Sequence, residues 1–189
     1  MNCRKRAKSM IERIIKEINL SLENECYLSA LGMALTLPDI CGKAEYPNEK
    51  STTKRYIEWF NTYVGSYEKF SGPYGDDMPY LSGEVLYNLR NSFLHQGTPN
   101  LCAGKIKNER CQIDDFILVI DDYTKSGHSH VAYDDKMNVS YKQLQVNLCN
   151  LCVRLSHVAE DYYKSNKNKF NFFRYTLKDN RIPKRNKEV

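Results

Sequence analysis

The chain has 189 residues, of which 41% are hydrophobic, 12% aromatic and 27% charged. This composition is typical of a folded globular domain and excludes a disordered or fibrous chain. The net charge of +5 is unevenly placed, because residues 164–189 carry a net charge of +7 and the remainder carries −2. We therefore expect a single domain over residues 1–168 and a basic, aromatic C-terminal tail over residues 169–189.

Two helices are predicted at the start of the chain. Residues 4–23 repeat apolar side chains at the three-and-four spacing of an amphipathic helix. Residues 25–41 carry a second apolar pattern of the same kind. A break is expected near Leu37, because Pro38 lacks an N–H and disfavours helical conformation in the residue before it.

Two further helices follow. Thr52 or Thr53 can cap a third helix that runs to about Val64 and has an aromatic face. A fourth helix is predicted over residues 80–96. Its end is marked by Gly97, which suits the left-handed conformation found after many helices.

After the fourth helix, the spacing of hydrophobic residues changes from a helical pattern to one typical of strands. Residues 115–120 and 129–133 are typical of two strands, and together they predict a β-hairpin inserted near residues 115–134. Ser140 and Gln143 form a capping-box pattern, which predicts the start of a long final helix. The expected fold is mainly α, a four- to five-helix bundle with the inserted β-hairpin.

The seven cysteines are odd in number and scattered, unlike the disulfide framework of a small secreted domain. The chain has no run of about 18 consecutive apolar residues, so no transmembrane helix is expected. The basic residues near the N-terminus lead into a charged amphipathic segment rather than the apolar segment of a signal peptide. We expect a cytoplasmic protein that does not associate with membranes.

A group of polar side chains interrupts the apolar pattern of the fourth helix. At ~100° per residue, Asn91 and His95 share one helix face, whereas Arg90 lies at the border of the apolar face beside Leu86. A guanidinium in that position requires a carboxylate, a polar subunit interface or an anionic ligand. These residues are the candidate reaction centre of the chain.

The segment from Arg90 to His95 reads RNSFLH and resembles the R-x4-6-H motif of the HEPN superfamily. The resemblance covers residues 81–97, and the helical first part of the chain is compatible with it. Many members of this superfamily are metal-independent ribonucleases. The resemblance implies a helical bundle that forms a homodimer, so that two copies of the motif line one cleft.

The resemblance also implies a role for each motif residue. His95 would exchange a proton with a ribose 2′-OH. Arg90 would hold the scissile phosphate, and Asn91 would orient the histidine or the phosphate. Cleavage would leave a 2′,3′-cyclic phosphate and would need neither a metal nor another cofactor. The resemblance suggests toxin–antitoxin, stress or phage-defence systems, with an antitoxin-like protein as a partner.

Two other interpretations stay open. In one, the chain is a non-catalytic HEPN-like module that binds nucleotide, RNA or a protein partner. In the other, it is a purely structural helical domain in which Arg90 pairs with Glu84 or Glu58 and His95 caps the end of its own helix.

The tail interleaves aromatic side chains with lysines and arginines. This composition can stack on bases and neutralise phosphates, so the tail is a candidate RNA-binding segment. Its candidate residues are Lys169, Phe172, Phe173, Arg174, Arg181, Lys184 and Arg185. The alternative is an aromatic patch that docks on the bundle.

Two patterns have the spacing of metal ligands. Cys149 and Cys152 form a C-x2-C pair, but they lie in a strongly periodic helical segment, where buried apolar roles are favoured. His128 and His130 alternate on one face of a predicted strand, where solvated surface positions are favoured. We predict no metal site.

Overall fold

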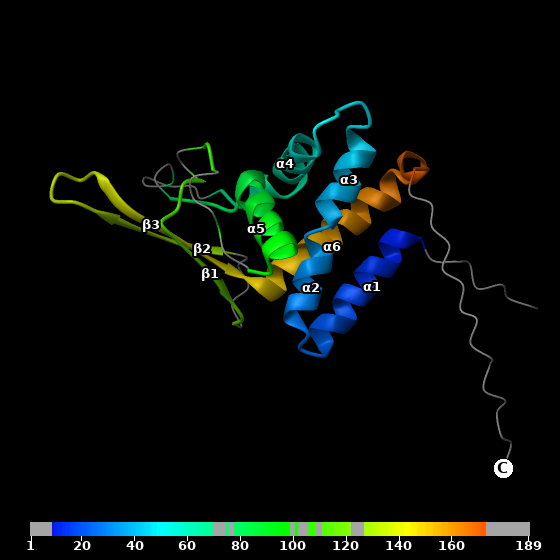
Figure 1. Ribbon diagram of the computed structural model, residues 1–189, viewed down its shortest axis with the longest axis horizontal. Coiled ribbons are helices and arrows are strands. Elements are labelled where there is room, and N and C mark those ends of the chain that lie inside the picture. Colours follow the sequence, from blue (N-terminus) through cyan, green and yellow to red (C-terminus); the bar gives the residue numbers. More distant parts are fainter. Residues whose placement is uncertain are drawn as a thin grey trace, which may run out of the picture.

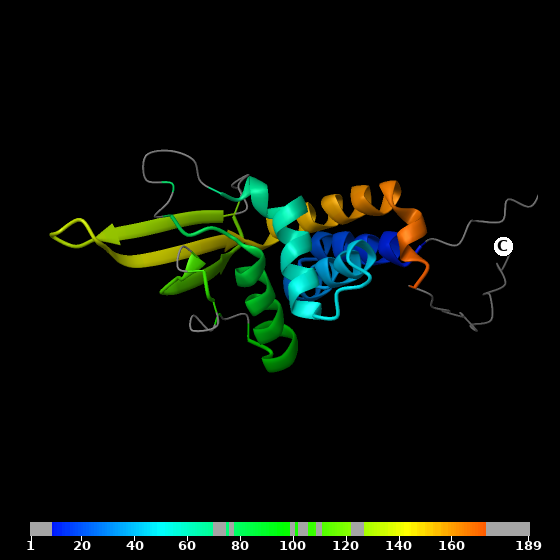
Figure 2. The ribbon, with the colours of Figure 1, turned by 90° about the horizontal axis from the view of Figure 1, so that it is seen from above.

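The computed structural model describes residues 9–69, 75, 78–98, 101, 106–108, 111–121 and 127–172. Within these residues the chain is mostly helical and carries a small three-stranded sheet, which projects from one end of the packed helices (Figures 1 and 2). The elements are α1 (Met10–Glu23), α2 (Tyr27–Ala34), α3 (Leu37–Glu45), α4 (Thr52–Tyr63), η1 (Gly65–Tyr67), α5 (Gly83–Gln96), β1 (Asp115–Val119), β2 (Gly127–Tyr133), β3 (Val139–Asn147), α6 (Leu148–Ser165) and η4 (Lys167–Phe170).

The first three helices follow the local sequence signals closely. Helix α1 begins at a capping box in which Ser9 accepts from the Glu12 amide and the Glu12 carboxylate accepts from the Ser9 amide. The expected break near Leu37 is confirmed, because α2 ends at Ala34 and α3 begins at Leu37 with Pro38 in its first turn. Helix α3 continues to Glu45, four residues past the predicted end of this segment.

Helices α4 and α5 also lie close to where the sequence predicts them, although α5 begins at Gly83, three residues after the predicted start. The cap of α4 is Ser51, one residue before the expected threonines, and it accepts from the Lys54 amide. Helix α5 is capped by Ser82, and Gly97 after its last residue has a φ of 71°, the left-handed conformation expected there.

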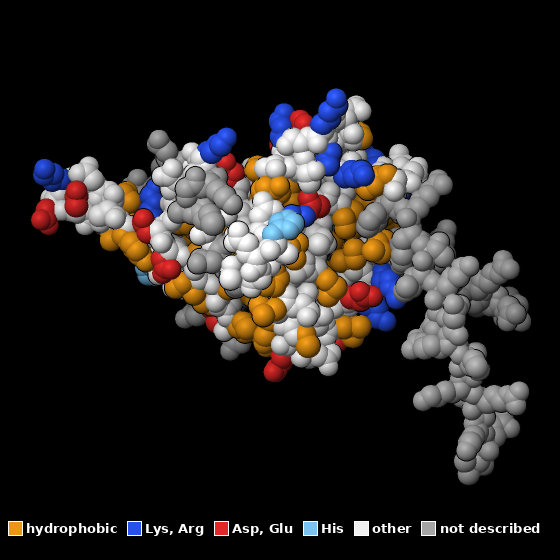
Figure 3. Space-filling model, in the orientation of Figure 1, with side chains coloured by type: hydrophobic (Ala, Val, Ile, Leu, Met, Phe, Trp, Pro, Cys, Tyr) orange, Lys and Arg blue, Asp and Glu red, His pale blue; other side chains and the backbone are white. Residues whose placement is uncertain are grey.

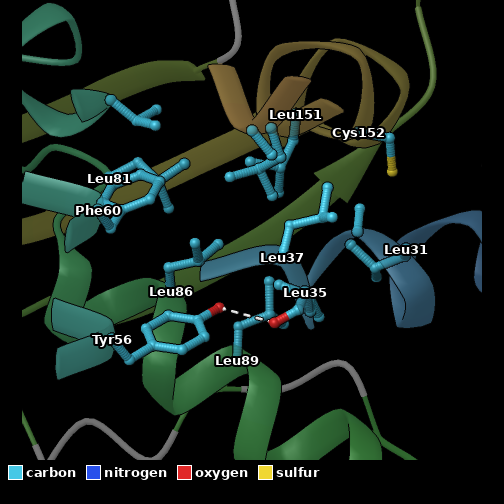
Figure 4. Close-up of a cluster of buried hydrophobic side chains, with 14 of the residues drawn as sticks. Leu31, Leu35, Leu37, Tyr56, Phe60, Leu81, Leu86, Leu89, Leu151 and Cys152 are labelled. Atoms are coloured by element: carbon cyan, nitrogen blue, oxygen red, sulfur yellow. Dashed lines mark hydrogen bonds between the residues drawn. The ribbon is translucent and has the colours of Figure 1, made fainter. Parts of the chain in front are cut away.

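The core lies between the helices. Figure 4 shows aromatic side chains of α4 packed against leucines from α2, α3, α5 and α6. Burial of each such side chain contributes roughly 1.5–3 kcal/mol to folding. The fully buried Tyr56 satisfies its hydroxyl by donating to the Leu35 carbonyl oxygen at 3.2 Å. This bond ties α4 to the segment that connects α2 to α3.

The sheet differs from the predicted hairpin. Its strand order is β1-β3-β2, with β1 parallel to β3 and β2 antiparallel to β3. The strands expected to pair with each other, β1 and β2, are therefore separated by β3, and the hairpin is formed by β2 and β3. Its turn is closed by Asp134, whose Oδ1 accepts from the amides of Lys136 and Asn138, both at 2.8 Å.

The predicted start of the last helix is wrong. Ser140 and Gln143 lie in β3, where Gln143 pairs with β1 on one side and with β2 on the other. Strand pairing on both edges outweighs the local capping pattern. Helix α6 begins at Leu148 instead, and Asn147 caps it by accepting from the Asn150 amide at 2.9 Å.

Candidate functional site

Helix α4 supports both helices that build the candidate site. On α3, Gly42 lies so close to α4 that an added Cβ would be 2.7 Å from the Arg55 carbonyl oxygen. On α5, a Cβ at Gly83 would be 2.6 Å from the Ile57 carbonyl oxygen. Asn61 also accepts from the Gly83 amide at 2.8 Å. These contacts fix α3 and α5 on a common support.

Arg90 of α5 connects the predicted site residues. Its Nη1 donates to Asn91 Oδ1 at 2.9 Å and lies 3.1 Å from His95 Nε2. Its Nε and Nη2 lie 3.1 and 3.0 Å from a single oxygen, Oδ2 of Asp39. The structure thus brings together all three residues of the predicted motif and adds a carboxylate from α3.

Asp39 is the functional candidate that sequence reasoning missed. The acids proposed as partners of Arg90 make other contacts: Glu58 lies 3.9 Å from Lys54, and Glu84 accepts from the Asn108 amide at 3.1 Å. Asp39 is 51 residues away from Arg90 in the chain, so no local spacing could link them. The available signal was an acid in the first turn of a helix, directly after Pro38.

The Asp39 carboxylate is poorly solvated. Its side chain is 19% exposed and that of Arg90 is 21% exposed. Asp39 Oδ1 is buried and has no hydrogen-bond partner among the residues that the structure describes. Burial raises the pKa of Asp39, and the nearby Arg90 guanidinium offsets this only in part. The carboxylate therefore interacts mainly with Arg90 and holds one side of the guanidinium.

The contact between Arg90 and His95 determines the tautomer of the histidine. A guanidinium has only donors, so His95 Nε2 accepts and the ring proton lies on Nδ1. His95 is exposed in the last turn of α5. The helix end is closed by backbone bonds from Gly97 to Phe93 and Ser92. The imidazole therefore lies against Arg90, and its unprotonated Nε2 is directed at the guanidinium.

The beginning of the tail packs on the helices. Lys169 pairs with Glu45 at 2.6 Å, and Phe172 stacks on Phe170 and lies 4.9 Å from the Lys43 ammonium. Of the predicted RNA-binding residues, Lys169 and Phe172 thus contact the bundle, as the docking alternative expects. The other five lie outside the described residues: Phe173, Arg174, Arg181, Lys184 and Arg185.

The metal-like patterns do not converge. Cys152 is buried in α6, and burial raises its pKa to about 12, while Cys149 is only partly buried. Among the described residues, no group of three or more His, Cys, Asp or Glu side chains could hold a metal ion. In the same part of the chain, no helix is long and apolar enough to cross a bilayer.

Comparison of the chain with family models, with curated proteins and with solved structures finds no match. The chemical interpretation of the site therefore depends on its own geometry and on the motif in α5.

Proposed function

We propose that the chain is a HEPN-like, metal-independent endoribonuclease whose reacting group consists of Arg90, Asn91 and His95. The observation that supports this most is that one guanidinium nitrogen, Arg90 Nη1, contacts both Asn91 and His95. A cation, an amide and an imidazole meet near the end of one helix. RNA cleavage through the 2′-OH needs such a set.

The proposed reaction starts at the ribose. His95 Nε2 takes the proton of the 2′-OH, and the oxygen O2′ forms a bond to the adjacent phosphorus. The bond from phosphorus to O5′ breaks, and O5′ takes up a proton from water. The products are a 2′,3′-cyclic phosphate and a free 5′-OH, with no metal required.

The partners of Arg90 orient its guanidinium so that it can bind a phosphate. Asp39 contacts Nε and Nη2, so the Nη1 side of the guanidinium faces Asn91 and His95. A phosphate that replaces those two acceptors at Nη1 would receive charge-assisted hydrogen bonds from a side chain that is already oriented. Negative charge that develops on the phosphate oxygens is stabilised there.

A homodimer is part of this proposal. Leu94, next to His95, is 40% exposed, and Leu28 of α2 is 58% exposed. Helices α2 and α5 approach closely, because a Cβ at Gly32 would lie 3.4 Å from the Phe93 ring. Figure 3 shows hydrophobic side chains gathered where Figure 1 draws α1, α2 and α5. Burial of these side chains against a second copy would place two sites near one interface.

The biological setting is proposed from the motif resemblance alone. A cytoplasmic ribonuclease of a toxin–antitoxin, stress or phage-defence system fits it, with an antitoxin-like protein as a candidate partner.

The test is cleavage of single-stranded RNA in EDTA by wild type, Arg90→Ala and His95→Ala. We expect both variants to lose about 100-fold or more in rate, the usual contribution of a catalytic acid or base. The matched controls are Arg13→Ala and His157→Ala, which change a partly exposed residue of α1 and an exposed residue of α6. Equal degradation by wild type and the two site variants, or none by any, would contradict a nuclease.

The second candidate function is a non-catalytic module that binds nucleotide, RNA or a protein partner. It is favoured by the fact that Arg90 Nη1 is already occupied by two acceptors within the chain. In that case RNA would bind and stay intact, and Arg90→Ala would weaken binding.

A further inference from the structure

A pocket of about 410 Å³ lies between α4 and α5 beside the reacting group. Asn91 belongs to both: its Oδ1 accepts from Arg90, and its side chain lines the pocket. Asn91 Nδ2 has no hydrogen-bond partner among the residues that the structure describes. The pocket is thus separated from Arg90 by a single side chain that still has donors to offer.

The pocket and the catalytic histidine lie along one stripe of α5. Glu84, Asn88 and Asn91 line the pocket, and His95 follows at the same three-and-four spacing. At 1.5 Å rise per residue, Asn91 and His95 are ~6 Å apart along the helix axis. A strand of RNA with a phosphate at Arg90 could therefore place a neighbouring base in this pocket.

The wall formed by Tyr87 offers a rigid aromatic surface. The Tyr87 hydroxyl lies 2.8 Å from Thr53 Oγ1, and its ring packs edge-on against Tyr56 with centroids 5.2 Å apart. Ile57 adds an aliphatic contact. Aromatic and aliphatic walls of this kind take up the flat face of a base.

Two carboxylates in the pocket lining offer hydrogen-bond acceptors. Glu58 and Glu84 line the pocket from α4 and α5, and Glu84 is oriented by the Asn108 amide at 3.1 Å. An ionised carboxylate only accepts hydrogen bonds, so it favours base edges with donors and disfavours edges with carbonyl oxygens. Guanine presents two adjacent donors, N1–H and the N2 amino group, whereas the single ring donor of uracil lies between two carbonyl oxygens.

Cations border the same pocket. Lys54 lies 3.0 Å from Glu49 and Lys107 is exposed. Their ammonium groups can neutralise phosphates on either side of a bound base.

We propose that this pocket binds a base of the RNA substrate, with guanine preferred over uracil, next to the phosphate held by Arg90. This inference rests on the proposed ribonuclease function for the choice of RNA as the occupant. Glu58 and Glu84 determine the preference, and Tyr87 forms the packing surface.

The experiment measures binding separately from cleavage. The His95→Ala variant is titrated with fluorescent single-stranded RNA hexamers that contain either one guanosine among uridines or uridines only. We expect the guanosine hexamer to bind about tenfold more tightly, as expected for a good two-point hydrogen-bonded contact. In Glu84→Gln and in Glu58→Gln, each made in the same background, the ratio should fall to within twofold. The matched control is Glu23→Gln, an exposed glutamate of α1, which should keep the tenfold ratio.

The outcomes separate this pocket from the nuclease. A guanosine preference that both glutamine variants remove supports the pocket even if wild type fails to cleave RNA, in which case only the ribonuclease proposal is lost. Cleavage by wild type with equal binding of the two hexamers overturns the pocket and leaves the nuclease standing. A preference that persists in both folded glutamine variants also overturns it.

Discussion

Helix α3 supplies an acid to two different cations, and the two pairs differ in chemistry. Near its start, Asp39 contacts Arg90 through one oxygen and leaves the other buried without a partner among the described residues. At its end, Glu45 accepts from Lys169 at 2.6 Å and from the Tyr162 hydroxyl at 2.7 Å.

The pKa shifts of the two acids have opposite signs. Burial raises the pKa of Asp39, whereas the hydrogen bond from Lys169 and then that from Tyr162 lower the pKa of Glu45. Glu45 is a satisfied structural contact that holds the start of the tail on the bundle. The Asp39–Arg90 pair combines a carboxylate oxygen that has no partner among the described residues with a guanidinium that contacts the partly buried Asn91 and the exposed His95. Unsatisfied buried polar atoms and raised carboxylate pKa values are frequent at functional sites.

The largest expected contrast between the two pairs is in catalysis. Arg90→Lys should lower the rate of RNA cleavage by about 100-fold, because a lysine ammonium cannot bind Asp39 on one side and a phosphate on the other as a guanidinium does. Lys169→Arg should keep the rate within about twofold. Initial rates on single-stranded RNA in EDTA measure both. If Arg90→Lys kept more than half of the wild-type rate, the proposed catalytic difference between the Asp39–Arg90 and Glu45–Lys169 pairs would be contradicted.

The next effect concerns the carboxylate behind Arg90. Asp39→Asn should lower cleavage by about tenfold, because Arg90 loses the charge that orients it while His95 stays in place. Asp39→Glu should recover part of the rate if orientation is what matters. The check is kcat against KM for the two variants. Unchanged kcat in Asp39→Asn would show that the pair is only structural.

Glu45 should affect stability and leave activity intact. Glu45→Gln weakens the bonds from Lys169 and Tyr162, and we expect a loss of roughly 1–2 kcal/mol in the free energy of unfolding. Urea denaturation measures this loss, and the cleavage rate of the same variant serves as the control. A Glu45→Gln protein as stable as wild type would mean that the start of the tail is not held by this contact.

The smallest expected effects are in the pH dependence of stability. The folded-state pKa of Glu45 lies below the ordinary value of 4.5. Its contribution to the free energy of unfolding is therefore present above that pH and is lost as the pH falls through the lowered pKa. The folded-state pKa of Asp39 lies above the ordinary value of 3.8. Its contribution to the free energy of unfolding is therefore complete below that pH and is lost as the pH rises through the raised pKa.

Unfolding of wild type, Glu45→Gln and Asp39→Asn at several pH values tests this contrast. In acid, the difference in the free energy of unfolding between wild type and Glu45→Gln should shrink. In the same range, the free energy of unfolding of wild type should rise relative to that of Asp39→Asn. If both stability differences changed in the same direction with pH, this would contradict the different environments assigned to the two acids.

The helices were predictable because their signals are local. Periodic apolar residues, the break before Pro38 and the left-handed Gly97 all act within one or two turns. The sheet was not predictable in the same way, because the position of β3 between β1 and β2 depends on pairing between distant segments. Ser140 and Gln143 matched a helix start, and the strand pairs on both sides of Gln143 outweighed it.

The candidate site likewise has one part that depends on local spacing and another that depends on contacts between distant segments. Asn91 and His95 belong to one helix, and their spacing in the sequence was enough to place them on one face. The long Arg90 side chain reaches both from the border of the apolar face. Asp39 comes from α3, and the pocket beside Asn91 requires α4 to pack on α5. Neither follows from spacing within one element.

The most direct test of the central claim is to identify the ends that the wild-type protein leaves on RNA in EDTA. Mass spectrometry of a single-stranded oligonucleotide should find 2′,3′-cyclic phosphate ends, which disappear with His95→Ala and with a 2′-deoxy substitution at the cleaved position. Ends that carry a 3′-OH, or equal cleavage of the deoxy-substituted strand, would contradict a reaction driven by the 2′-OH at Arg90, Asn91 and His95.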